Sequence, residues 1–341
     1  MRAIQYDRTG DADVLTLVGK PDPAPGPGEL AVRIHSSGVN PTDVKSRRGV
    51  AGKQDHVDPA QTPGQDGAGV VEAAGSEADQ EWVGRRVWIW EAAWRRPDGT
   101  AQEVAIVPVT HVAQLPDDVP FSVGASLGIP FLTAHRCLTV GEHMPKQLGP
   151  SMLDGKIVLI AGGAGAVGNA AIQLAKWSGA TVVTTVSSEE KTQLAKSAGA
   201  DHVIDYRSQD VVAEVLQVTP DGVDAIVEVA PGPNAPIDAA VIAQGGVIAT
   251  YASEGGAGMT IPVRAFMSKN AGWAFVMVYT APKAAKLQAV RDVELALVSG
   301  AIRVGEAHGL PLHHFPLERA ADAHRAFEGS AVGKVVIDVV P

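Results

Sequence analysis

The residues best suited to chemistry in this sequence form a glycine-rich turn between two apolar runs. The segment comprises the apolar run 157–161, then Gly163, Gly165 and Gly168, a helical pattern to Ser178, and a second apolar run over 181–186. In a strand–turn–helix unit, Gly163 would let the strand turn sharply, Gly165 would admit a pyrophosphate and Gly168 would let the helix pack closely. The first helical N–H groups, including those of Ala166 and Val167, would face the phosphates. The spacing and its context predict a dinucleotide site.

The tip of the second strand indicates which dinucleotide is preferred. An acidic residue there binds the ribose 2′-OH of NAD, whereas a 2′-phosphate needs hydroxyls and cations. The strand ends without a carboxylate at Ser187, and Lys191 follows within one helical turn. With Tyr206 after the next strand, these residues predict a 2′-phosphate pocket and NADPH as the cofactor. Lys191 as an ordinary solvated helix residue is the alternative, and Glu189 opposes the phosphate reading unless it points outward.

The composition excludes several other classes of protein. The chain has 341 residues, enough for two domains, and a net charge of −10, which argues against nucleic-acid or anionic-membrane partners. Cys137 is the only cysteine, so neither an internal disulfide nor a cysteine-based zinc site is possible. The N-terminus lacks a signal-peptide pattern and no apolar run is long enough to span a membrane, so a soluble cytoplasmic protein is expected.

Two patterns of secondary structure divide the chain. Short strands separated by Gly and Pro turns occupy residues 1–116 and predict a small β-barrel. Strands alternate with helices after residue 157, which predicts a doubly wound parallel sheet. The run 273–279 predicts one further strand, with the edge of the sheet as a candidate position. The final strand 334–339 suggests a return to the first domain. We expect an α/β protein with a substrate domain at 1–123 and 282–341 and a dinucleotide-binding domain at 124–281.

Five segments together resemble one known superfamily. They are 38–43 (GVNPTD), 63–71 (PGQDGAGVV), 128–134 (GIPFLTA), the glycine turn with 171–176, and 199–207 (GADHVIDYR). In this order they resemble the medium-chain dehydrogenase/reductase superfamily, in its zinc-independent quinone oxidoreductase (zeta-crystallin-like) family. The resemblance implies a GroES-like β-barrel domain interrupted by a Rossmann domain, with a cleft between them. It also implies a homodimer formed through the edge strand 273–279, although an ordinary buried strand is an equal alternative.

Zinc-dependent relatives carry a cysteine after the Gly-Val pair and a His-Glu pair after Pro-Gly. This chain has Asn40 and Gln65-Asp66 at those places, so no metal site is expected. Without a metal, hydride transfer from a nicotinamide needs an acceptor that is already electron-poor, such as a quinone or a conjugated enone.

The resemblance also assigns roles to individual residues. Asn40 and Thr133 would lie near the nicotinamide and the acceptor, and Asn40 would donate its amide N–H to an acceptor oxygen; as a turn residue, it would have no such role. Asp43 is either a helix cap, which is favoured, or a pocket residue. Trp90 is either an aromatic wall of the pocket or barrel core. The residues expected to line the cofactor are Val229, Ala230, Tyr251 and Lys334.

The expected activity is NADPH-dependent reduction of quinones. Reduction of a conjugated C=C bond in an enal, enone or enoyl thioester is the alternative, and it benefits from a placed acid. The helix after Asn40 lacks the tyrosine that the family often has there, which tilts the expectation toward quinones. A non-catalytic, NADPH-binding structural or RNA-binding role, as in crystallin-like relatives, is a third possibility. The acidic charge and the absence of a basic stripe argue against RNA.

Overall fold

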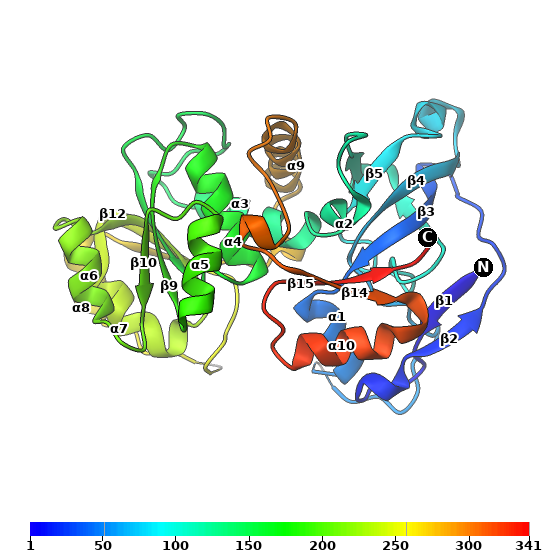
Figure 1. Cartoon of the computed structure of the whole chain (residues 1–341), viewed down its shortest axis with the longest axis horizontal. Coiled ribbons are helices and arrows are strands. Elements are labelled where there is room, and N and C mark those ends of the chain that lie inside the picture. Colours follow the sequence, from blue (N-terminus) through cyan, green and yellow to red (C-terminus); the bar gives the residue numbers. More distant parts are fainter. Residues whose placement is uncertain (51, 257, 341) are drawn as a thin grey trace. The chain divides into compact units, whose positions relative to one another are not determined.

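The computed structural model describes residues 1–50, 52–256 and 258–340, and it divides into two compact units. Unit 1 comprises residues 1–129 and 312–341, and unit 2 comprises residues 130–311. Figure 1 shows both units coloured along the chain, with the C-terminal strands returning to the N-terminal unit. The architecture expected from the sequence, a β domain interrupted by a domain with a parallel sheet, is confirmed by the two units and their sheets.

Unit 1 is built on a seven-stranded sheet. Its strands are β3 (Glu29–Gly38), β4 (Asp66–Ala74), β5 (Arg86–Ile89), β6 (Val104–Pro108), β7 (Val112–Gln114), β14 (Leu312–Pro316) and β15 (Lys334–Asp338), and a separate pair comprises β1 (Arg2–Gln5) and β2 (Thr16–Gly19). The order is β14-β15-β3-β4-β5-β7, with β6 also paired to β3. All of these pairings are antiparallel except β14 with β15. Alternating apolar residues on β3, including Leu30, Val32 and Ile34, are fully buried and form the core.

Unit 2 contains a six-stranded, entirely parallel sheet. Its strands are β8 (Ile157–Ala161), β9 (Thr181–Val186), β10 (His202–Asp205), β11 (Val223–Glu228), β12 (Ile242–Thr250) and β13 (Gly272–Phe275). The order β10-β9-β8-β11-β12-β13 changes direction between β8 and β11. Ligands of such sheets bind at the carboxyl ends of the strands beside this switch point. The apolar runs Ile157–Ala161 and Val223–Glu228 are buried because helices cover both faces of the sheet.

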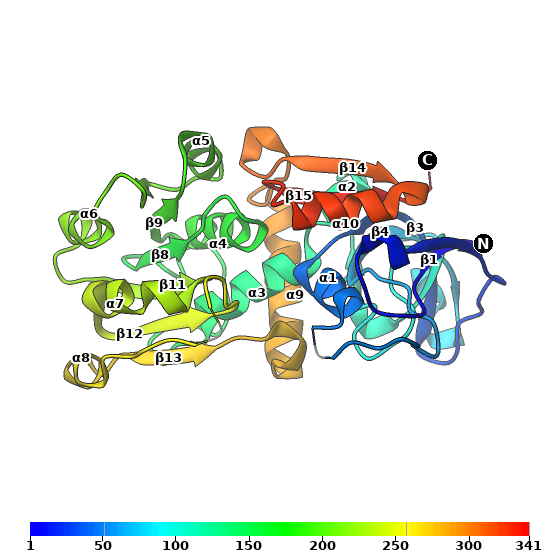
Figure 2. The same cartoon turned by 90° about the horizontal axis from the view of Figure 1, so that it is seen from below.

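The helices connect these strands. They are α1 (Pro41–Arg48), α2 (Phe121–Gly124), α3 (Gly128–Thr139), α4 (Ala166–Trp177), α5 (Glu189–Ser197), α6 (Val211–Val218), α7 (Pro231–Val241), α8 (Val263–Lys269), α9 (Lys283–Val298) and α10 (Ala320–Glu328). Short 3₁₀ turns cover Ala12–Val14, Glu77–Trp82, Val109–His111, Val278–Thr280, Glu306–His308 and Leu317–Arg319. Figure 2 shows strands of unit 2 side by side in the spatial order β9, β8, β11, β12 and β13, with α4 beside β8.

The borders of the units differ from those expected from the sequence. The segment 282–311, which the sequence assigns to the first domain, lies in unit 2. Hydrogen bonds explain this placement: Asp292 of α9 accepts from His135 at 2.7 Å, and the backbone N–H of Arg303 donates to Gln173 at 2.8 Å. The predicted first domain also ends at residue 341, which is outside the described residues. Periodicity identifies a helix but cannot identify the unit on which it packs.

The last strand of the parallel sheet is shorter than its apolar run. The sequence predicts a strand over 273–279, but β13 ends at Phe275 and a 3₁₀ turn occupies Val278–Thr280. Among the described residues β13 pairs with β12 alone, so it is an edge strand, as the apolar run suggested. The side chain of Phe275 is 71% exposed, and that of Met277 is also exposed. Within the part of the chain that the structure describes, no helix combines the length and apolar character needed to cross a bilayer.

Candidate functional site

The glycine turn joins β8 to α4 at the carboxyl end of the sheet, beside the switch point. Gly162 has a φ of 74°, in the left-handed region, so the sharp turn falls one residue earlier than Gly163, where the sequence placed it. Gly163 is required for a different reason, since a Cβ there would lie 2.2 Å from Thr184 Oγ1. The N–H groups of Gly162 and Gly163 both donate to Thr185 O at 3.1 Å, which fixes the turn against β9.

Two further glycines of the turn face different surroundings. A Cβ at Gly168 would lie 2.3 Å from Gly162 O, so close packing of α4 on the turn excludes any side chain. A Cβ at Gly165 would have ordinary contact only, 3.5 Å from Gly162 O, and the φ of −80° suits any residue. The protein itself therefore gives no reason for glycine at position 165, whereas a ligand approaching the backbone does. The first N–H groups of α4, including those of Ala166 and Val167, have no acceptor within the helix.

The residues expected to form a 2′-phosphate pocket converge at the tip of β9. Lys191 Nζ donates to Ser187 Oγ at 3.0 Å, and its backbone N–H donates to Ser188 Oγ at 3.3 Å, which caps α5. The N–H of Tyr206 donates to Val186 O at 3.1 Å, so the backbone of Tyr206 lies at the tip of β9, and its side chain is exposed. Glu189 and Glu190 are exposed at the start of α5, where acidic residues are favoured. The Ser187 hydroxyl and the Lys191 ammonium thus lie together at the end of β9, where the backbone of Tyr206 is also bound.

Val229, Ala230 and Tyr251 follow the carboxyl ends of β11 and β12. The N–H of Tyr251 donates to Glu228 O at 3.1 Å, and the N–H of Ala230 donates to Glu228 Oε1. Asn234 of α7 donates to both Glu228 carboxylate oxygens, at 3.1 and 3.2 Å. Glu228 therefore ties together the two segments, after β11 and after β12, that carry the three expected cofactor-lining residues. Sequence reasoning missed Glu228, although an acid at the end of an apolar strand was a usable signal.

A second buried carboxyl accompanies Glu228. Asp238 of α7 is 1% exposed, and burial, together with the negative charge of Glu228, raises the pKa of Asp238 to about 9. Burial also raises the pKa of Glu228. The pair therefore retains a proton at neutral pH, and Asp238 as the proton carrier would donate a hydrogen bond to Glu228.

We expect this pair to make the folded protein less stable as pH rises. The pKa of Asp238 in the unfolded chain is about 3.9. Because its folded value is higher, its stabilising contribution is complete below about pH 4 and is lost as pH rises toward about 9. Asp238→Asn removes this dependence. Urea unfolding at about pH 5 and about pH 8 should therefore show the variant gaining about 4 kcal/mol over the parent at the higher pH, since each pH unit contributes about 1.4 kcal/mol.

The matched control is Asp221→Asn, which changes an exposed carboxyl of the same unit. Its unfolding free energy should follow the parent at both pH values. A difference between Asp238→Asn and the parent that stays constant with pH would contradict a shared proton.

Unit 1 contains the second group of expected site residues. Asn40 follows β3 and caps α1, and its side chain is 2% exposed. Its amide Oδ1 accepts from Lys334 Nζ at 2.7 Å, and its Nδ2 donates to Asp66 Oδ2 at 2.8 Å. Lys334 Nζ lies 3.5 Å from Asp66 Oδ2. The sequence grouped Lys334 with the cofactor-lining residues, but its ammonium is directed to Asn40 and Asp66, which belong to the same unit.

Asp43 completes this buried group. Its Oδ2 accepts the backbone N–H of Asn40 at 2.8 Å, the helix-capping role favoured from the sequence, and its Oδ1 accepts the N–H of Gly64 at 3.0 Å. Burial and the neighbouring Asp66 raise the pKa of Asp43 to about 7, although the N–H donors and Lys334 oppose this. Asp43 therefore exchanges a proton near neutral pH.

The remaining expected residues are placed as follows. Thr133 lies buried on α3 in unit 2, and Trp90 is buried in unit 1 with its ring stacked on His111 at a centroid distance of 4.5 Å. Trp88, two residues earlier on β5, is also fully buried. The sequence identified Asp66 only as part of the Gln65-Asp66 pair, which replaces the His-Glu pair of zinc-dependent relatives. Its position as the hydrogen-bond partner of Asn40 depends on the pairing of β3 with β4.

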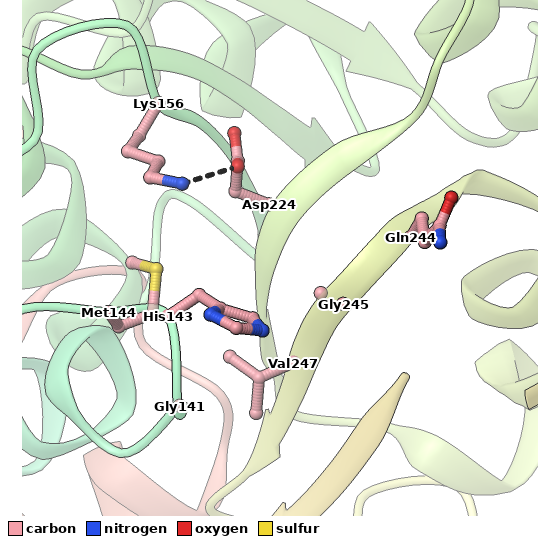
Figure 3. A pocket seen from close by; sticks show the side chains of 9 residues that line it. Gly141, His143, Met144, Lys156, Asp224, Gln244, Gly245 and Val247 are labelled. Carbon is pink, nitrogen blue, oxygen red and sulfur yellow. Dashed lines mark hydrogen bonds and ion pairs between the residues drawn. The ribbon is translucent and has the colours of Figure 1, made fainter. Parts of the chain in front are cut away.

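Unit 2 contains a pocket at the end of the strands opposite to the glycine turn. It is lined by Gly141, His143, Met144, Lys156, Asp224, Gln244, Gly245, Gly246 and Val247. Figure 3 shows Lys156 paired with Asp224 there, at 2.9 Å. Lys156 directly precedes β8 and Asp224 is the second residue of β11, so the pocket is at the amino ends of the strands. It therefore does not belong to the expected cofactor site. Among the described residues, no three His, Cys, Asp or Glu side chains are grouped to hold a metal.

Comparison with known proteins agrees with this architecture. Residues 26–117 match the family model of the alcohol dehydrogenase GroES-like domain, and residues 166–293 match that of the zinc-binding dehydrogenases. A quinone oxidoreductase from Sus scrofa is 30% identical over 99% of this chain and 97% of its own length. A mycobacterial quinone oxidoreductase structure is 29% identical, covers 99% of this chain and 100% of its own, and superimposes with a TM-score of 0.84.

A second mycobacterial structure, solved in complex with NADPH, is 30% identical over 99% of this chain and 100% of its own, with a TM-score of 0.81. The two family models define a two-domain oxidoreductase with GroES-like and Rossmann parts. Given the identity over nearly the full length, the chain belongs to the quinone oxidoreductase family of the medium-chain dehydrogenase/reductase superfamily.

Proposed function

We propose that this protein is an NADPH-dependent quinone oxidoreductase of the zinc-independent, zeta-crystallin-like kind. The observation that carries the proposal is the glycine turn after β8, where Gly165 leaves the backbone open, while Ser187 and Lys191 meet at the end of the neighbouring strand β9. These residues fit a dinucleotide with a 2′-phosphate: the α4 N-terminus for the pyrophosphate and Lys191 for the added phosphate. Related proteins named quinone oxidoreductases, and a relative bound to NADPH, support this assignment.

The chemistry divides between the cofactor and the protein. When bound, the reduced nicotinamide supplies the hydride. Val229, Ala230 and Tyr251 would orient it, since they follow the strand ends next to the switch point. Asn40 and Thr133 are the proposed catalytic residues, and Asn40 would donate its second amide N–H to an acceptor oxygen as negative charge develops. Among the described residues, that N–H has only Gly38 O, at 3.5 Å. Asp43 and Trp90 are proposed to shape the substrate pocket.

The zinc-independent assignment rests on the side chains at the positions where zinc-dependent relatives carry ligands. Asn40 presents an amide that is already bonded to Lys334 and Asp66. An ammonium 2.7 Å from the amide oxygen would repel a divalent cation. The acceptor must therefore be reducible without a Lewis acid, as a quinone or a conjugated enone is.

The rate of NADPH consumption, followed by absorbance, tests this proposal. NADPH and NADH are each supplied with a para-quinone and, separately, with a conjugated enal. Rapid loss of NADPH with the quinone is expected. Faster loss with the enal would assign the enzyme to double-bond reduction. Tight NADPH binding with no turnover of either acceptor would favour the non-catalytic alternative and contradict the proposal.

We also propose a cytoplasmic homodimer formed through β13. The strand has a free edge, and exposed apolar side chains, including Phe275 and Met277, lie on it and just beyond it. Phe275→Lys should convert a dimer to a monomer in sedimentation equilibrium. Val298→Lys, which changes an exposed apolar residue on α9, is the matched control and should remain dimeric. A monomeric parent protein, or a dimer unaffected by Phe275→Lys, would contradict this interface.

A further inference from the structure

Four polar side chains from separate elements meet in the interior of unit 1. They are Asn40 before α1, Asp43 on α1, Asp66 at the start of β4 and Lys334 at the start of β15. Asp66 is fully buried, and Lys334 is 2% exposed. Burying a lysine and a carboxylate together rarely stabilises a fold more than apolar residues of the same size would. The presence of Lys334 in this core therefore calls for an explanation other than stability.

The hydrogen bonds of Asn40 provide that explanation. A lysine ammonium has only donors and a carboxylate has only acceptors, so the amide can satisfy both in one orientation alone. Its Oδ1 faces Lys334 Nζ at 2.7 Å, and its Nδ2 faces Asp66 Oδ2 at 2.8 Å. Rotation of the amide by 180° would place two donors together and two acceptors together. Lys334 and Asp66 therefore lock the amide.

Asp66 is itself held in place from the opposite side. Its second oxygen, Oδ1, accepts the backbone N–H of Ile129 at 2.8 Å. Lys334 begins β15, whose following residues pair with β3 directly before Asn40. Asp66 and Lys334 thus belong to strands β4 and β15, and Ile129 belongs to the first turn of α3. Strands and helices fix side chains more tightly than loops do. The buried charge of Lys334 beside Oδ1 also polarises the amide and makes its remaining N–H a stronger donor.

We propose that Lys334 is a positioning residue, which orients and polarises the Asn40 amide for the acceptor oxygen. This inference rests on the proposed function of Asn40. It differs from the role expected from the sequence, in which Lys334 lines the cofactor. In zinc-dependent relatives a metal ion supplies a fixed positive charge at this place. Here the Lys334 ammonium would supply that charge, and the Asn40 amide would transmit its effect to the acceptor oxygen.

The experiment uses the full-length protein with four variants. Lys334→Met removes the charge but leaves Asp66 buried without its cation, which risks misfolding. The double variant Asp66→Asn with Lys334→Met removes both charges and avoids that risk. Lys334→Arg keeps the cation. Lys45→Met is the matched control, because it removes an exposed lysine from α1 of the same unit.

Steady-state kinetics with NADPH and a quinone separate positioning from folding. The double variant should unfold near the temperature of the parent and bind NADPH with an unchanged Kd, while kcat falls at least about 10-fold. A role in lining the cofactor would instead raise the Kd for NADPH. Lys334→Arg should restore most of the turnover. A folded double variant with the kcat of the parent would overturn the proposal.

A second readout does not depend on activity. The side-chain amide signals of Asn40 in a ¹⁵N–¹H NMR spectrum, assigned by their loss in Asn40→Ala, should move in the double variant and stay in Lys45→Met. If the parent oxidises no NADPH with any quinone, the proposed function fails, yet these signals still report whether Lys334 sets the amide. Unmoved signals would overturn the positioning role independently.

Discussion

Gly165→Ala should weaken NADPH binding by about 100-fold, which corresponds to about 2.8 kcal/mol, without unfolding the protein. The added Cβ meets protein atoms only at 3.5 Å, and the φ of −80° carries no strain. A methyl group there would instead occupy the space through which a pyrophosphate reaches the backbone. The cost to the cap of α4 and the gain from a stiffer unfolded chain nearly offset each other, so the unfolding free energy should change by less than about 1 kcal/mol.

Gly168→Ala is the informative comparison for this prediction. Its Cβ would lie 2.3 Å from Gly162 O and 2.9 Å from Gly163 Cα, both backbone atoms that cannot move aside cheaply. This variant should lose roughly 1–3 kcal/mol of stability, together with binding. Fluorescence titration with NADPH and urea unfolding measure the two quantities separately. Gly165→Ala that binds NADPH as tightly as the parent would show that the pyrophosphate does not approach this residue.

Lys191→Ala should remove the preference for NADPH over NADH. The ammonium lies 3.0 Å from Ser187 Oγ at the tip of β9, where a 2′-phosphate would make a charge-assisted hydrogen bond. Such bonds contribute about 1.5–3 kcal/mol, so the Kd for NADPH should rise by roughly 10- to 100-fold. The Kd for NADH, which lacks the phosphate, should change by less than about twofold.

Two further variants serve as comparisons for Lys191→Ala. Lys196→Ala removes an exposed lysine from the same helix and should leave both affinities unchanged. Ser187→Asp places a carboxylate at the strand tip, where it can accept from a ribose hydroxyl and repel a phosphate, so it should favour NADH. Equal losses for the two cofactors in Lys191→Ala would mean that Lys191 supports α5 rather than binding a phosphate.

The sequence determined the parts of this protein that depend on neighbours along the chain. Apolar runs, the glycine spacing and alternating periodicities predicted both domain types. Ser187 lies just before the cap of α5 and Lys191 lies in its first turn, so their convergence followed from their short separation along the chain. The capping bond from Asn40 to Asp43 was likewise a local pattern.

Only the tertiary structure decided the contacts between distant segments. Lys334 reaches Asn40 across 294 positions of the chain, and Asp238 reaches Glu228 because α7 folds back on β11. The same holds for α9, which a hydrogen bond from His135 to Asp292 attaches to unit 2. No periodicity encodes such pairs, because each depends on which elements pack together. Burial then converts ordinary surface residue types into the groups with shifted pKa values at this site.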